Sequence, residues 1–269
     1  MANDNKYTPN DLLMMRPNEF RTIVRKGEYT GPTVEVCRGY AMANLAIVPR
    51  EYAFEFLLFC NRNPRPCPVL DVTDPGSPHP PLLAPKADLR TDLPKYRVYR
   101  SGEIVAEPTD IVQYWREDLV AFLLGCSGSF DWVLRASNIQ YRLIGVYKTN
   151  LACRQAGRFY GPMAVTCRLI KGTQDAVRAI QISSRHLIMH GPPVHIGDPD
   201  AIGIKNLYEP YAFFGKTIEP KSPDEIAMFW GCGVTAESIA IEAKVPFMIT
   251  HYPTHMFITD RLSEELAVL

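Results

Sequence analysis

Four stretches in the first half of the chain have the signals of helices. Residues 8–26 begin with a capping-type Thr-Pro-Asn-Asp, which predicts one or two short helices. Residues 49–60 open with a proline at a first-turn position and predict another helix. A threonine cap followed by spaced apolar residues predicts a helix over 109–123, the most regular of the set. The fourth, 130–138, has Ser129 as its predicted cap.

Other stretches have the patterns of strands. Residues 68–73 form a short apolar run closed by Asp-Pro-Gly-Ser-Pro, which is typical of a buried strand that ends in a loop. Residues 93–106 alternate and predict a hairpin with its turn at 101–102. Further along, 163–170 predicts a strand and 173–184 a helix.

The last third of the chain combines both patterns. Apolar runs at 227–230 and 246–250 flank a predicted helix over 235–243. We interpret the three as a βαβ unit, which implies parallel strands. Because the pattern changes over 141–188, that region is a candidate for a small α+β insertion.

Composition describes an ordinary globular protein with room for two domains. The 269 residues are 46% hydrophobic and 22% charged, and a single core stops growing near this length. The net charge is zero, so no long-range field gathers nucleic acid or anionic lipid. We expect neither as a partner, and the longest apolar stretch, 52–60, is too short to span a membrane.

The cysteines and the first residues favour a reducing compartment. Seven cysteines form an odd set without CxxC pairs, which is typical of free thiols. The chain begins with acidic and polar residues where a signal peptide needs a basic tip and an apolar run. We therefore expect a cytoplasmic protein. Since no GxGxxG or GxxxxGK motif is present, we expect no nucleotide cofactor.

The turn WGCGVT at 230–235 is a candidate anion site. It lies where a predicted strand ends and a helix begins, so its glycines allow close approach and the helix offers unpaired N–H donors. Gly231, Cys232 and Thr235 are therefore candidates for substrate binding. A tight structural turn with a buried cysteine explains the pattern equally well.

The turn GCSGS at 125–129 repeats this chemistry. It places a thiol and small hydroxyls just before a predicted helix, where the pKa of a thiol can be lowered. Cys126, Ser127 and Ser129 are candidates for binding or nucleophilic attack. The pattern alone favours a simpler interpretation, in which Ser129 only caps the helix.

Four of the six histidines lie in two short loops, HGPPVHIGDP at 190–199 and HYPTH at 251–255. Stiff loops hold functional side chains accessible, and imidazole titrates near neutral pH. We expect acid or base work from His251 or His255, with His195 as a further candidate. A metal site is the weaker alternative, because a proline interrupts any HxxxH helical face and no HExxH or cysteine pair is present.

Basic and amide side chains occur together in the middle of the sequence. Lys148, Arg158, Arg168 and Arg185 lie in one region with Asn150. Such a mixture suits a substrate with two carboxylates. Each of these residues alone is more often a solvated surface residue.

These segments resemble the signature blocks of the D-glutamate cyclase family. The blocks occur in one order at 44–49, 68–77, 125–127, 147–150, 161–163, 178–183, 193–199, 230–235, 249–251 and 255–260. The resemblance implies an α/β fold: a three-layer sandwich with a mixed, partly parallel sheet and a smaller inserted α+β domain. We place the sandwich at 1–130 and 190–269 and the insertion at 131–189.

Three positions depart from the family pattern. Gly128 replaces a bulky residue, Asp131 a glutamate and Thr254 a glycine. The departures are local, so they bear on loop geometry and substrate preference more than on the fold.

The resemblance implies conversion of D-glutamate to 5-oxo-D-proline with loss of water, and we expect no metal or other cofactor. It carries over no catalytic residue. Our hypothesis assigns acid and base work to the histidines named above, N–H donors to the two turns, and the α-carboxylate to Arg158 or Arg185. A hydro-lyase for another hydroxy or amino acid and a non-catalytic carboxylate-binding protein are the alternatives. A homodimer is left open.

Overall fold

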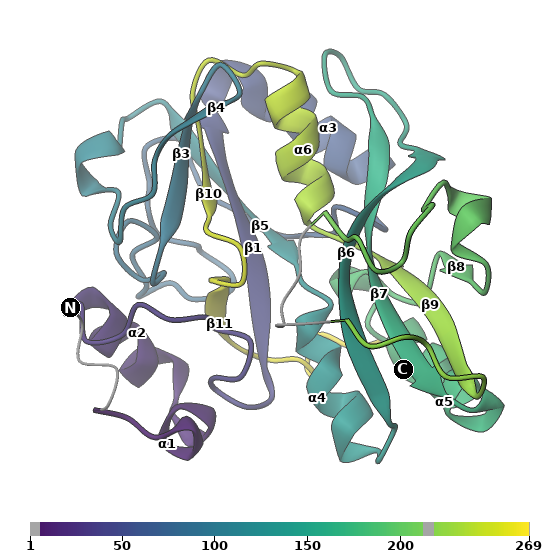
Figure 1. Ribbon diagram of the computed structural model, residues 1–269. Coiled ribbons are helices and arrows are strands. Elements are labelled where there is room, and N and C mark those ends of the chain that lie inside the picture. Colours follow the sequence, from purple (N-terminus) through teal and green to yellow (C-terminus); the bar gives the residue numbers. More distant parts are fainter. Residues whose placement is uncertain (1–5, 212–217, 269) are drawn as a thin grey trace.

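The computed structural model describes residues 6–211 and 218–268, and it is a mixed α/β protein with two antiparallel sheets (Figure 1). The first sheet contains β1 (Tyr40–Pro49), β2 (Val69–Val72), β3 (Tyr96–Arg100), β4 (Glu103–Ala106), β5 (Leu119–Gly125), β10 (Met248–His251) and β11 (Phe257–Leu262). The second contains β6 (Tyr141–Ala152), β7 (Pro162–Lys171), β8 (His195–Ile196) and β9 (Glu225–Gly231). The helices are α1 (Pro9–Met14), α2 (Pro17–Arg25), α3 (Arg50–Arg62), α4 (Gly128–Ala136), α5 (Thr173–Ser184) and α6 (Val234–Glu242), with short 3₁₀ turns at Val112–Tyr114, Leu187–Met189 and Pro199–Ile202.

β1 is the centre of the first sheet. The strands follow the order β2-β5-β1-β10-β3-β4, and β11 also pairs with β1. An unbroken register joins β1 to β5, from Ala43 opposite Gly125 to Pro49 opposite Leu119. Both strands are apolar almost throughout because side chains cover both faces of the sheet at this point.

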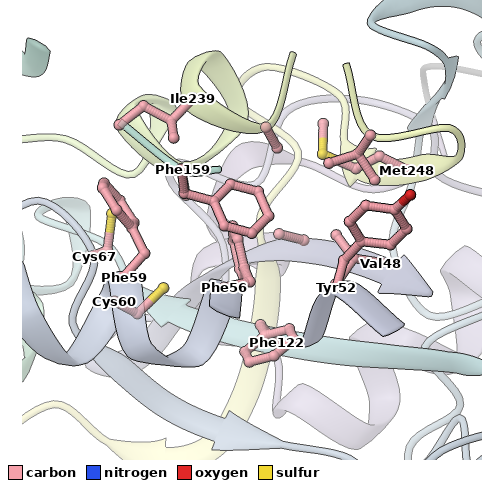
Figure 2. Packing of buried hydrophobic residues seen from close by; sticks show 14 of the residues in the cluster. Val48, Tyr52, Phe56, Phe59, Cys60, Cys67, Phe122, Phe159, Ile239 and Met248 are labelled. Atoms are coloured by element: carbon pink, nitrogen blue, oxygen red, sulfur yellow. The ribbon is translucent and has the colours of Figure 1, made fainter. Parts of the chain in front are cut away.

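One core cluster fixes the helices that cover this sheet. Phe56 of α3 and Phe122 of β5 meet edge to face, with ring centroids 4.9 Å apart. Phe159 packs on Phe56, and Ile239 of α6 enters the same cluster (Figure 2). Burial of each such side chain contributes roughly 1.5–3 kcal/mol. The cluster therefore holds α6 in place, and with it the first turn of that helix.

Two helices carry the chain between the sheets. α4 follows β5 of the first sheet and leads to β6 of the second, and α6 leads from β9 back to β10. Phe130 of α4 packs against Trp230 of β9 with ring centroids 6.1 Å apart. Each connecting helix contacts both sheets, because α4 also bonds to β1 through Ser129, and α6 packs on β1 and bonds to β7 through Thr235. Both helix N-termini therefore lie between the sheets (Figure 1).

The helix predicted over 109–123 is wrong. The chain has only a 3₁₀ turn at Val112–Tyr114, and then β5 begins at Leu119. All seven residues of β5 are buried between β1 and β2. An unbroken apolar run of this length is a buried strand. The helical spacing before it came from loop residues, Ile111, Tyr114 and Trp115, that pack against the same core as β5.

The parallel part of the predicted fold is also wrong. The strands at 227–230 and 246–250 and the helix between them exist, but β9 and β10 belong to different sheets. Every strand pair within the described residues is antiparallel. α6 is therefore a crossover between sheets, a difference that the order of elements along the chain cannot reveal.

Other predictions are confirmed. They include the mixed α/β class, the hairpin at β3 and β4, the strand β2, the helices α3 and α5, and the short N-terminal helices. The sandwich and the division at 131–189 stay predictions, and the second sheet takes β8 and β9 from beyond residue 189. Within the described residues, no helix is long and apolar enough to cross a membrane.

Candidate active site

A cavity of about 370 Å³ lies between the two sheets. Residues of β1, β3 and β10 line one side, residues of β6 and β7 the other, and the first turns of α4 and α6 complete the wall. Pockets for small ligands have volumes of roughly 300–1,000 Å³. The cavity lies where both connections between the sheets begin, and it is the candidate active site.

Glycines let the chain turn tightly at the two helix starts. Gly125 and Gly231 are the last residues of β5 and β9. A Cβ at Gly125 would clash with the carbonyl oxygen of Ile188, and one at Gly231 with that of Arg65. The glycines predicted to allow close approach are therefore required by neighbouring backbone, which brings both turns to the cavity wall.

Cysteines follow these glycines at both turns. Cys126 and Cys232 line the cavity, and burial raises the pKa of Cys126 to about 11 and that of Cys232 to about 12. Both thiols stay protonated at neutral pH, so neither is an activated nucleophile. The N–H groups of Ser127 and Gly233 have no hydrogen-bond partner among the described residues. They are available to an anion.

A buried ion pair forms one wall of the cavity. Nε and Nη2 of Arg168 on β7 each donate to a carboxylate oxygen of Asp131 on α4 over 2.8 Å. The guanidinium also donates to the hydroxyls of Ser127 and Thr166, over 3.1 and 3.2 Å. Only 1% of the Arg168 side chain is exposed. The pair neutralises its own charge and ties α4 to the second sheet.

Glu237, in the first turn of α6, is the second carboxyl group that lines the cavity. Its Oε1 accepts a hydrogen bond from the hydroxyl of Tyr99, and no ion pair involves it among the described residues. Burial raises the pKa of Glu237. Arg97 of β3 lines the same cavity and pairs through Nε with Glu107 over 2.8 Å, which leaves its outer N–H groups for a ligand.

Two neutral histidines complete the site. His190 and His251 line the cavity, and burial lowers the pKa of each to about 4. Nδ1 of His190 lies 2.7 Å from the carbonyl oxygen of Arg65, so that nitrogen carries the proton. Nδ1 of His251 lies 3.2 Å from the N–H of Leu45 and 3.5 Å from its carbonyl oxygen, and the shorter contact, in which Nδ1 accepts, favours a proton on Nε2. At neutral pH, His251 is thus a donor toward the cavity rather than a cation.

Five of the residues predicted from the sequence line this cavity: Cys126, Ser127, Arg168, Cys232 and His251. Gly231, Ser129 and Thr235 lie beside it. The Ser129 hydroxyl accepts from the N–H of Met42 over 2.9 Å, and that of Thr235 accepts from the N–H of Ala164 over 2.9 Å. The predicted capping of α4 by Ser129 is wrong, because the helix begins at Gly128, two residues before the predicted start, and Ser129 lies inside it.

Six other predicted residues do not line the cavity. His255 faces the carbonyl oxygens of Pro253 and Thr30, and His195 faces that of Asp198. The remaining four have exposed side chains: Lys148, Asn150, Arg158 and Arg185. Arg158 is paired with Glu55 over 3.0 Å, outside the site.

Sequence reasoning did not propose Asn44, Arg97, Tyr99 or Glu237. Asn44 carried a usable signal, because it is a lone amide within the apolar run of β1, and its Nδ2 donates to the carbonyl oxygen of Gly125 over 2.7 Å. The others carried no such signal, because Arg97 and Tyr99 belong to a short strand of alternating basic and apolar residues and Glu237 is one acid in a helix of mostly small and apolar residues. Thr254, one of the three departures expected from the family pattern, lines the cavity with a φ of 70°, a conformation that favours glycine.

The fold and the cavity together define a class of protein. It is a mixed α/β protein whose pocket between two sheets is lined by N–H donors, a guanidinium and carboxyl groups. The model for the family described as D-glutamate cyclase matches residues 120–260. Of the residues that line the cavity, only Val34, Asn44 and Arg97 lie outside that range. The chain belongs to the D-glutamate cyclase family.

Close relatives support this assignment over nearly the whole chain. A protein of Geobacillus kaustophilus named "Putative hydro-lyase" is 52% identical over 95% of this chain and 98% of its own length. One of Bacillus licheniformis with the same description is 50% identical over 95% and 98%. Hydro-lyases are carbon-oxygen lyases, and the predicted enzyme class is confirmed at that level.

Among solved structures, a nitrogen repressor-like protein from Methanococcus jannaschii aligns with a TM-score of 0.38 and 8% identity, over 84% of this chain and 88% of that one. A likeness at that level has no bearing on fold or function.

No three His, Cys, Asp or Glu side chains in the described part of the chain cluster as metal ligands.

Proposed function

We propose that this protein closes D-glutamate to 5-oxo-D-proline with loss of water in the cavity between the two sheets. The observation that supports the proposal most is the meeting of two helix N-termini at one cavity that Arg97 also lines. D-Glutamate has two carboxylates, and fixed N–H donors with a guanidinium are groups that bind carboxylates in proteins.

The substrate brings its own nucleophile. Its amine and its γ-carboxyl belong to one molecule, so the protein has to fold the chain of the substrate rather than gather two reactants. In our proposal the outer N–H groups of Arg97 bind the α-carboxylate. The turns at Ser127 and Gly233 then face the γ-carboxyl, where negative charge develops on oxygen during attack.

His251 is suited to the same oxyanion. Its Nε2 proton points away from the Leu45 N–H that its other nitrogen accepts, and the ring is neutral at pH 7. A neutral imidazole can donate a hydrogen bond to the oxyanion without bringing a buried charge. We therefore propose donation by His251 in place of the base role expected from the sequence.

The test is mass-resolved turnover by the purified protein. D-Glutamate, L-glutamate and a panel of hydroxy and amino dicarboxylates are compared, each with and without prior chelator treatment. The proposal expects water loss from D-glutamate that is insensitive to chelator, and little from the L enantiomer. Turnover of a different acid alone would indicate another hydro-lyase, and tight binding without turnover would indicate a carboxylate-binding protein.

Two further expectations belong to this proposal. A cytoplasmic location fits the seven cysteines, all of which are free thiols. Independence from metal is a separate claim, which the chelator arm of the experiment tests directly.

A further inference from the structure

The two carboxyl groups that line the cavity have different surroundings. Asp131 accepts two charge-assisted hydrogen bonds from Arg168, whereas Glu237 accepts one from the neutral hydroxyl of Tyr99. We propose, on the basis of the proposed cyclisation, that Glu237 is the catalytic residue that carries a proton from the substrate amine to the departing γ-oxygen.

The proton balance of cyclisation requires such a group. An ammonium and a carboxylate become a lactam and water, so one C–N bond forms, one C–O bond breaks, and two protons move from nitrogen to the leaving oxygen. The first can pass within the substrate, which gives a free amine and a γ-carboxylic acid. After the amine attacks, the second must leave nitrogen as hydroxide departs and becomes water.

A protonated carboxyl group can do both parts of the second transfer. Glu237 gives its proton to the departing hydroxyl, and its carboxylate then takes the proton from the lactam nitrogen. The residue ends the cycle in its starting form, and no other reactant is consumed. Oε2, the oxygen that Tyr99 does not hold, can give its proton to the leaving oxygen and then take the one on nitrogen, because both atoms are bonded to the same carbon.

Other groups that line the cavity are less suited to this transfer. Both oxygens of Asp131 already accept hydrogen bonds from the guanidinium of Arg168. The histidines are neutral, with pKa values about 4, so they hold no spare proton to give at neutral pH. Cys126 and Cys232 release a proton only well above neutral pH.

The groups around Glu237 act on its pKa in opposite directions and fix the orientation of its carboxyl group. Burial raises its pKa, while the hydrogen bond from Tyr99 and the charge of Arg97 lower it. Cys232 before α6 and His251 on β10 also line this part of the cavity, and both are uncharged at neutral pH. Tyr99 is a positioning residue, because its hydroxyl fixes one carboxyl oxygen and thereby orients the other.

The experiment compares Glu237→Gln with Glu242→Gln, an exposed glutamate at the end of the same helix. Glutamine keeps the acceptor for Tyr99 but cannot carry a proton. We expect Glu237→Gln to lower kcat for D-glutamate by about a hundredfold or more, with binding of D-glutamate by calorimetry retained. The Glu242→Gln control should match the wild type in both measurements. Thermal unfolding of both variants checks that they fold.

Tyr99→Phe adds a readout that a purely structural role would not move. Removing a hydrogen bond to the carboxylate raises the pKa of Glu237, so the alkaline limb of the kcat profile should shift to higher pH. Near-wild-type kcat in folded Glu237→Gln, with active wild type, would overturn this assignment alone. A wild type that does not turn over D-glutamate would overturn the proposed function, and this inference with it.

Discussion

The turns that begin α4 and α6 have similar sequences, but their acidic residues have different partners. Each follows a buried strand, has a glycine and then a cysteine, and carries an acid in its first helical turn. At α4 the acid is Asp131, which forms an ion pair with Arg168, and at α6 it is Glu237, which accepts a hydrogen bond from Tyr99 and has no ion-pair partner among the described residues. The first acid stabilises the wall through its guanidinium partner, whereas burial without an ion-pair partner raises the pKa of the second.

The largest effect should come from breaking the ion pair at α4. Arg168→Met leaves Asp131 buried without a partner, so we expect a loss of about 3–5 kcal/mol in the free energy of unfolding. Urea titration measures it. The control is Arg261→Met, which removes an exposed pair with Glu265 and should cost about 0–1 kcal/mol. Equal losses in the two variants would mean that the buried pair does not hold α4.

Low pH should destabilise the folded protein, because two histidines in the cavity are buried in their neutral form. The pKa of His190 and of His251 is about 4 in the folded protein and 6.5 ordinarily, so the unfolded chain binds more protons between these values. Each neutral ring therefore contributes about 3 kcal/mol to the free energy of unfolding. This contribution is fully present above pH 6.5 and is lost as pH falls through 4. Denaturant titrations across this range should show a smaller loss in His251→Gln than in the wild type. If the free energy of unfolding of His251→Gln fell with pH as steeply as that of the wild type, burial of the His251 ring would not be the cause of the loss.

The glycines in the two turns should differ in how well they tolerate substitution by alanine. A Cβ at Gly233 would clash with the Asn44 amide, which is fixed by its hydrogen bond to Gly125, so Gly233→Ala should cost about 1–3 kcal/mol. At Gly128 the obstacle is the terminal methyl of Met42, 2.6 Å away, which can rotate aside. Gly128→Ala should therefore change stability by less than about 1 kcal/mol. Thermal unfolding of both variants decides, and the reverse order would contradict the comparison.

The smallest effect concerns substrate affinity. Arg97→Gln should raise KM for D-glutamate about tenfold with little change in kcat, because it removes a charged hydrogen bond used in binding. Arg158→Gln is the matched control, since that side chain lies outside the cavity with Glu55. Steady-state kinetics on both variants separates the two positions. If Arg158→Gln raised KM and Arg97→Gln did not, the sequence-based assignment of Arg158 would be the better one.

Local sequence was enough to identify the turns but not their neighbours. The glycine and cysteine pattern at 125–129 and 230–235 pointed to two helix starts, and both line one cavity. Arg168 was one basic residue among several, because its partner Asp131 lies 37 positions away and only the pairing of β7 near α4 brings them together. His195 and His255 looked equivalent to His251, since exposure to a cavity depends on tertiary packing that loop composition does not encode.

The most direct test of the central claim uses D-glutamate labelled with a heavy oxygen isotope at both γ-oxygens. Cyclisation expels one γ-oxygen as water, so the account predicts 5-oxo-D-proline with one label and labelled water in equal amount. A product that keeps both γ-labels, or no product from an intact protein, would contradict it.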